Sequence, residues 1–155
     1  MVNRLTGLAT AAARNAVMRK VLLAAAKPVV AAAKRKVPVR TGGMRATIGT
    51  KVVLKEDVAK GYVVIGPLRT TATSRRRGTT VTAVGRKLAK MGLTGYEPAA
   101  VAHLVERGHR LVRGGRQVGQ VAGKPFLGPA VEETRQQVMA IITQMLEKHL
   151  LAAGV

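Results

Sequence analysis

Seven carboxylates and three histidines are the side chains best able to do acid–base or metal chemistry in this chain of 155 residues, which has no cysteine. The absence of cysteine excludes disulfides, thiolate metal ligands and thiol nucleophiles. His103, His109 and His149 are not paired with one another at the His-x-x-x-His spacing that puts two metal ligands on one helical face. We therefore predict that the protein is not an enzyme and that it binds neither a metal nor a cofactor.

Positive charge is the other chemical feature of the sequence. Lys and Arg total 27 against 7 Asp and Glu, which gives a formal net charge of +20. Residues 1–55 hold 12 basic residues and no acid. Because a surface of one sign attracts a partner of the opposite sign, we expect this part of the chain to contact something negative.

Two basic clusters supply the candidate contact residues. One recurs every seven residues along a predicted helix and the other lies in a polar tract; together they are Lys20, Lys27, Lys34, Arg75, Arg76, Arg77, Arg86 and Lys87. Either DNA phosphates or an acidic neighbouring protein could bind these basic side chains. With one Phe, two Tyr and no Trp, the chain lacks the aromatic faces on which single-stranded nucleic acids stack. A membrane partner is disfavoured because the apolar face of the helix is mostly alanine.

The lysine row requires a long helix, which we predict over residues 3–36. Its apolar face recurs at spacings of three and four and consists of Met18, Leu22, Ala25, Val29 and Ala33. Pro28 should kink or restart this helix near residue 27 because it removes a backbone donor. Pro38 should end it, because the residue before a proline avoids helical angles.

The rest of the chain predicts one α+β domain over residues 1–155, with two long helices packed on a small antiparallel sheet. We expect a glycine turn at 40–45, a β-hairpin at 46–66, a short helix and strands over 98–123, and a long helix over 126–152. Residues 68–95 form a polar, basic segment that we interpret as a structureless insertion, mobile in the free protein.

Three motifs occur in order along the chain. They are Pro38-Val39-Arg40-Thr41-Gly42-Gly43-Met44, then Val105-Glu106-Arg107-Gly108, then Lys124-Pro125-Phe126-Leu127-Gly128-Pro129. Their order and spacing resemble the tail-completion or head–tail joining family of tailed phages, which includes proteins similar to minor tail protein Z of lambda-type phages. The residues that carry the family motifs are Pro38, Thr41, Gly42, Met44, Glu106, Gly108, Pro125, Phe126 and Pro129. Arg40 departs from the family, in which an acid is common at that position.

The resemblance implies a structural virion protein that forms a ring in the phage neck, completes the tail and joins it to the portal or adaptor of the head. It implies a homo-oligomer, with a hexamer favoured over a dodecamer. Its protein partners would be the portal or adaptor ring on one side and the tail terminator or tail tube protein on the other. DNA in the lumen would be a further contact. The protein would reside in the virion, and in the host cytoplasm during assembly. The alternative is a free-standing basic nucleic-acid-binding protein, which rests on the charge of +20 alone and lacks helix-turn-helix spacing.

Overall fold

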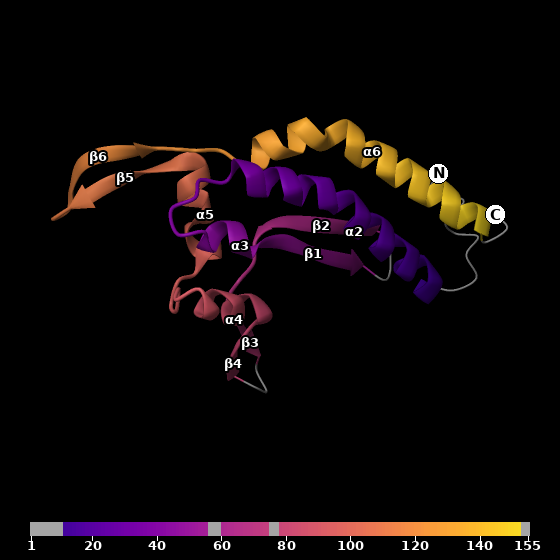
Figure 1. Ribbon diagram of the computed structural model, residues 1–155, viewed down its shortest axis with the longest axis horizontal. Coiled ribbons are helices and arrows are strands. Elements are labelled where there is room, and N and C mark those ends of the chain that lie inside the picture. The colour runs from indigo at the N-terminus through magenta and orange to yellow at the C-terminus, as the bar shows by residue number, and fades with distance from the viewer. Residues whose placement is uncertain (1–10, 56–59, 75–77, 153–155) are drawn as a thin grey trace.

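Two long antiparallel helices and a β-hairpin make up the body of the protein (Figure 1). The computed structural model describes residues 11–55, 60–74 and 78–152. Helix α2 (Ala11–Lys36) lies between helix α6 (Leu127–Ala152) on one side and the hairpin of β1 (Ile48–Lys55) and β2 (Lys60–Pro67) on the other. This arrangement confirms the predicted α+β class with a small antiparallel sheet.

Helix α2 is the central element because it contacts both α6 and the sheet. Its buried side chains are small and cover more of the helix surface than a single stripe: Val21, Ala25, Ala26, Val29, Ala32 and Ala33. The predicted restart near residue 27 is wrong, since the helix continues through Pro28. Close packing on both sides of Pro28 holds the neighbouring turns, so the loss of one backbone donor does not interrupt the helix. Residues 3–10 of the predicted helix lie outside the described residues.

A short helix follows the exit from α2. The predicted turn at 40–45 is wrong in its second half, where α3 (Gly43–Thr47) begins. Gly42 precedes it with φ 75°, a left-handed conformation that favours glycine. Gly43 is packed so closely that an added Cβ would lie 2.9 Å from side-chain carbons of Leu93 and Tyr96. Both glycines of the motif are therefore required by the local geometry.

The hairpin β1–β2 is an antiparallel two-stranded sheet in which Val52 pairs with Val63 and Lys51 with Val64. One face packs on α2, which is why Ile48 is buried and Val52 and Val63 are partly buried. The other face is open, and Tyr62 and Val64 are both about half exposed on it. The sheet is thus covered on one side only within the described part of the chain.

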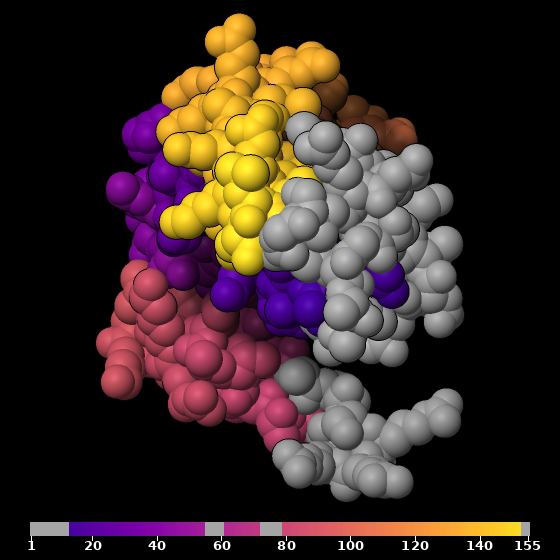
Figure 2. All heavy atoms as spheres, turned by 90° about the vertical axis from the view of Figure 1, so that its right-hand side faces the viewer, coloured from indigo at the N-terminus to yellow at the C-terminus, as the bar shows by residue number. Residues whose placement is uncertain are grey.

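The segment 68–95 is not a structureless loop, so that prediction is wrong. It contains a second hairpin, β3 (Thr71–Ser74) and β4 (Gly78–Val81), and a helix, α4 (Ala83–Lys90). Thr82 caps α4 by accepting a hydrogen bond from the backbone N–H of Gly85, and Leu88 is buried. Figure 2 shows this segment below the two long helices. Its threonines favour strands, which explains why a polar composition still forms regular structure.

Helix α5 (Pro98–Arg107) leads into a third hairpin, β5 (Gly108–Arg113) and β6 (Arg116–Ala122). We call residues 108–122 the arm, because the hairpin extends away from the body (Figure 1). After the arm the chain returns to the core at Phe126, which is fully buried with Ala33, Met44, Ile48 and Ala130. The arm is therefore anchored at the base and free of the core along its length.

Candidate functional site

The base of the arm is held by the carboxylate of Glu106, at the end of α5. It accepts hydrogen bonds from the backbone N–H groups of Phe126 at 2.9 Å, of Leu127 at 3.2 Å and of Gly128 at 3.2 Å. These are donors at the start of α6 that have no partner within the helix. The negative charge also suits the positive end of the helix dipole. Glu106 thus links two of the family motifs, which are 20 residues apart in the sequence, into one structural unit.

Two glycines let the strands of the arm come together at this point. Gly108 has φ 78°, and a Cβ there would collide with the backbone of Val121 and Gly123. A Cβ on Gly123 would in turn meet the backbone of Glu106 and Arg107. The close approach also permits the hydrogen bond from Lys124 N–H to the Val105 carbonyl, at 2.7 Å. The close backbone packing at Gly108 and Gly123 thus acts together with the Glu106 carboxylate to fix the base of the arm.

The remaining motif residues surround the same core. Met44 is buried there, Pro38 is partly buried, and the hydroxyl of Thr41 accepts a hydrogen bond from Gly43 N–H at 3.4 Å. Pro125 and Pro129 are exposed on either side of the buried Phe126. The motif residues therefore support the fold around the arm and do not form a catalytic cluster.

The arm exposes apolar side chains along most of its length. Val112 is 63% and Val118 62% exposed, and Leu111 and Val121 are about 40% exposed. Three arginines, Arg110, Arg113 and Arg116, accompany them, and the arm carries no acid. An isolated two-stranded hairpin is marginally stable in water, so contact with another surface would stabilise such a projection. Arginine is enriched at protein interfaces, and the exposed valines and Leu111 give the arm apolar surface that a contact could bury.

An apolar hollow lies elsewhere on the body, where α2, β2 and α6 meet. It has a volume of about 240 Å³, and its lining is Leu22, Ala25, Ala26, Val29, Val63, Ile65, Val131, Arg135, Val138, Met139 and Ile142. Val131 and Met139 are 48% and 59% exposed at its edge. The hollow is a second unfilled apolar surface.

The basic residues predicted to contact a negative partner lie on two different helices, α2 and α4, in the described part of the chain. Lys20 and Lys27 are exposed on α2, whereas Lys34 is partly buried. Arg86 and Lys87 lie on α4, where Arg86 donates a hydrogen bond to the Val81 carbonyl at 3.3 Å. Arg75, Arg76 and Arg77 lie outside the described residues. The structure therefore does not bring the lysine row and the described part of the second cluster together.

Carboxylates in the described part of the chain serve mainly as internal partners. Glu97 accepts hydrogen bonds from the N–H and the hydroxyl of Thr70, which ties α5 to the start of the insertion. Glu133 pairs with Arg35 at 2.6 Å and with Lys36 at 2.9 Å. Hydrogen bonds, from Lys36 first and Arg35 second, lower the pKa of Glu133 below its ordinary value. No local pattern in the sequence predicts these pairings, because they join segments far apart along the chain.

The three histidines do not assemble a site. Glu106 and His109 have the three-residue spacing that places two side chains on one face of a helix. They do not share a helix face, because α5 ends at Arg107, and the Glu106 carboxylate accepts hydrogen bonds from the start of α6. The Nδ1 atom of His109 is buried without a hydrogen-bond partner in the described part of the chain. Across residues 11–55, 60–74 and 78–152, no group of three or more His, Asp or Glu is placed to hold a metal ion. None of the helices in those ranges combines the length and hydrophobicity that a bilayer crossing requires.

Comparison with protein families gives one match. The family model "HK97-gp10_like: Bacteriophage HK97-gp10, putative tail-component" matches residues 1–108, which run from the N-terminus to the end of α5 and so include the first two motifs. No curated protein and no solved structure matches the chain. The more specific similarity to minor tail protein Z stays a prediction. Because the match covers more than half of the 155 residues, the chain belongs to the HK97-gp10-like family of bacteriophage tail components and is a structural protein of the virion.

Proposed function

We propose that this tail component is a subunit of a ring in the phage neck, which completes the tail and joins it to the portal or adaptor of the head. On its other side the ring contacts the tail terminator or tail tube protein, and DNA passes through the lumen. A hexamer is favoured over a dodecamer. The single observation that carries the proposal is the arm. It is held at its base by residues of the family motifs, it extends away from the body, and its apolar side chains are exposed.

The arm gains stability by contacting another chain. Burying the exposed halves of its four aliphatic side chains would contribute on the order of 3–6 kcal/mol, taking about 1.5–3 kcal/mol for a whole side chain. That gain also offsets the marginal stability of a two-stranded hairpin in water. The apolar residues of the arm are thus consistent with a contact made in the assembled particle.

A second copy of this chain is the occupant that best matches the arm. Each copy offers a projection, the arm, and an apolar hollow at the junction of α2, β2 and α6. A contact between two different patches of identical subunits is heterologous, and such contacts generate a ring when the rotation from one subunit to the next closes. The pairing rests on apolar contact, because Arg135 is the one charged residue that lines the hollow. Glu132 and Glu147, elsewhere on α6, have no ion-pair partner among the described residues and are available to arginines of the arm outside the hollow.

Cysteine cross-linking tests this contact directly, because the chain has no cysteine of its own. The variant carries Val112→Cys in the arm and Met139→Cys at the hollow, and phage particles containing it are oxidised and analysed without reductant. We expect a ladder of multimers that ends at the copy number of the ring. The control pairs Val112→Cys with Gln137→Cys, an exposed position on another face of α6.

Two results would contradict this proposal. Particles that give monomer only, or the same ladder with the Gln137 control, would show that the arm does not dock at the hollow of a neighbour. Absence of the protein from purified necks, together with tight binding of the free protein to DNA, would favour the alternative of a free-standing nucleic-acid-binding protein.

A further inference from the structure

A long groove follows the outer edge of β1, on the side of α2 away from α6. It consists of two hollows that adjoin along α2, with volumes of about 660 and 500 Å³. Helix α2 forms one wall, from Asn15 to Lys34, and β1 forms the other, from Ile48 to Leu54. We call this the β1 groove. It is separate from the arm and from the hollow beside α6, so it is not part of the proposed contact between copies.

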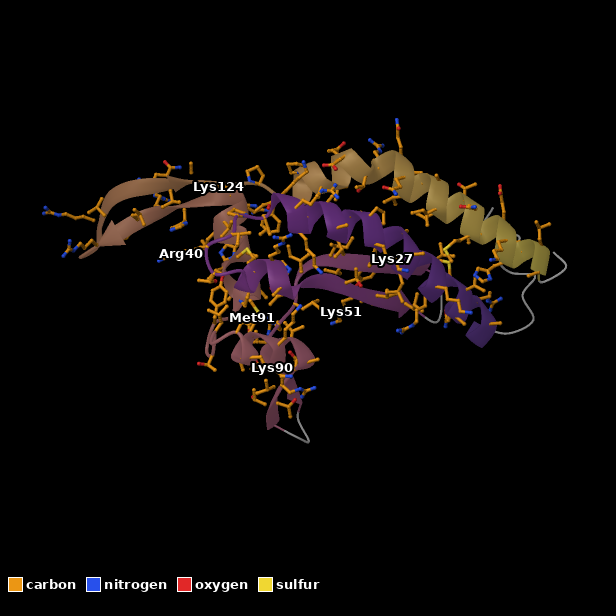
Figure 3. All side chains as sticks on the ribbon, in the orientation of Figure 1. Lys27, Arg40, Lys51, Lys90, Met91 and Lys124 are labelled. Carbon is orange, nitrogen blue, oxygen red and sulfur yellow. The ribbon has the colours of Figure 1, made fainter. Side chains whose placement is uncertain are left out.

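The walls of the β1 groove are apolar and its only charges are positive. Leu23, Val30 and Ile48 contribute the apolar surface. Four cations line it, namely Arg19, Lys27, Lys34 and Lys51, and no acid is among the lining residues. Lys27 and Lys34 come from the predicted lysine row, which was expected to contact a negative partner, and both border this groove. Figure 3 shows Lys27 on α2 and Lys51 on β1, the two elements that form the walls.

The backbone of β1 has hydrogen-bonding capacity left on this side. Among the described residues β1 pairs with β2 alone, so alternate N–H and C=O groups point away from the sheet along its free edge. An added strand would continue the sheet and lie in the β1 groove. From Asn15 to Lys34 the wall is about 28 Å long, at 1.5 Å per helical residue. That length matches about eight residues of an extended strand at 3.4 Å each, and β1 itself has 8 residues.

We propose that the β1 groove binds an extended acidic segment of a partner protein by strand addition to β1. Backbone hydrogen bonds along β1 would hold the segment, and its carboxylates at alternate positions would meet Lys27 and Lys34 on α2. Leu23 and Val30 on the same wall would pack against the methylene stems of these lysines, while the other side chains of the segment point to the opposite, open face of the sheet. A DNA duplex fits these features less well, because its phosphates gain nothing from apolar walls or from a strand edge.

A further copy of this chain is not the occupant. The occupant must be extended and acidic, and none of the strands in the described part of the chain carries an acid. The described glutamates lie in α5 and α6 or directly before α5. The partner is therefore a different, acidic protein. The proposal does not rest on ring formation, and its test uses the purified full-length chain rather than the assembled particle.

The probe is a fluorescent octapeptide of four Val-Glu repeats, whose binding is measured by anisotropy at about 0.15 M salt, where exposed charges are largely screened. We expect the double variant Lys27→Glu and Lys34→Glu to bind it at least about tenfold more weakly, a change of about 1.4 kcal/mol. The matched control, Lys90→Glu with Lys148→Glu, changes the net charge equally at exposed sites away from the groove and should lose less than about threefold.

A second peptide separates strand addition from simple charge attraction. Four Pro-Glu repeats keep the four carboxylates, but proline has no N–H to donate to a strand edge. We expect this peptide to bind the parent protein at least about tenfold more weakly than the Val-Glu peptide. Circular dichroism melting of each variant shows that the fold is retained, since glutamate is a good helix former on the exposed surface of α2.

Three results would overturn the proposal. The first is equal loss of affinity in the groove variant and the matched control, which would show general attraction to a basic protein. The second is equal binding of the two peptides, which would exclude strand addition. The third is that a 12-base-pair duplex, and not the Val-Glu peptide, loses affinity in the groove variant, which would assign the surface to DNA. The cysteine ladder described above is expected to be unchanged in the groove variant, so the two proposals fail separately.

Discussion

Replacing Glu106 by Gln tests whether the base of the arm and the start of α6 are one structural unit. The carboxylate receives three backbone N–H groups, from Phe126, Leu127 and Gly128. The amide of Gln keeps one acceptor oxygen and turns an N–H₂ group toward these donors. Hydrogen bonds to a charged acceptor contribute about 1.5–3 kcal/mol, and a charge at a helix N-terminus about 0.3–1 kcal/mol. We expect a loss of about 3 kcal/mol in the free energy of unfolding.

Thermal unfolding followed by circular dichroism measures this loss. For a chain of this size, about 3 kcal/mol corresponds to a decrease of about 6–12 °C in the melting temperature. The control is Glu132→Gln, in the first turns of α6, whose carboxylate is exposed and has no hydrogen-bond or ion-pair partner among the described residues. It should change stability by less than about 0.5 kcal/mol. If the two variants melt together, the Glu106 carboxylate does not hold α6 and the argument is refuted.

Three further predictions concern the core, an ion pair and the basic tract. Phe126→Ala should destabilise the protein by about 3–5 kcal/mol because the ring is fully buried, as chemical denaturation will measure; a value below about 1 kcal/mol would contradict the burial. Glu133→Gln should lower the free energy of unfolding at neutral pH, because a carboxylate with a lowered pKa stabilises the fold only while it is charged. The difference from the parent should vanish as the pH falls below the ordinary pKa of 4.5 and through the lowered pKa of Glu133. A difference in the free energy of unfolding that stays constant with pH would refute this. Replacing Arg75, Arg76 and Arg77 together with Ser should impair head–tail joining in extracts, as counted by infectious particles formed from separate heads and tails; unchanged joining would show that this tract does not contact a negative surface.

Helix positions could be predicted from the sequence because they depend on local patterns. The apolar spacing of α2 and the Pro98 start of α5 are readable within one or two turns of the chain. The same local reasoning failed where packing overrode it. At Pro28 the surrounding contacts keep α2 continuous, and in the insertion the Thr82 cap and the buried Leu88 order a polar segment.

The sequence by itself determined the class of the molecule. A charge of +20 and three ordered motifs predict a basic structural protein of a tailed phage, and the family match to bacteriophage tail components agrees with that class. These are properties of composition and of short segments, which do not depend on how distant parts of the chain meet.

The candidate surfaces, in contrast, were decided by the tertiary structure alone. Glu106 meets α6 across about twenty residues, and Lys27 and Lys34 border β1, an element that follows them in the chain and whose free edge no local pattern reveals. The exposure of Val112 and Val118 likewise depends on the direction that Gly108 and Gly123 give to the arm. Contacts between distant segments are set by packing of the whole fold, so a pattern read along one segment cannot contain them.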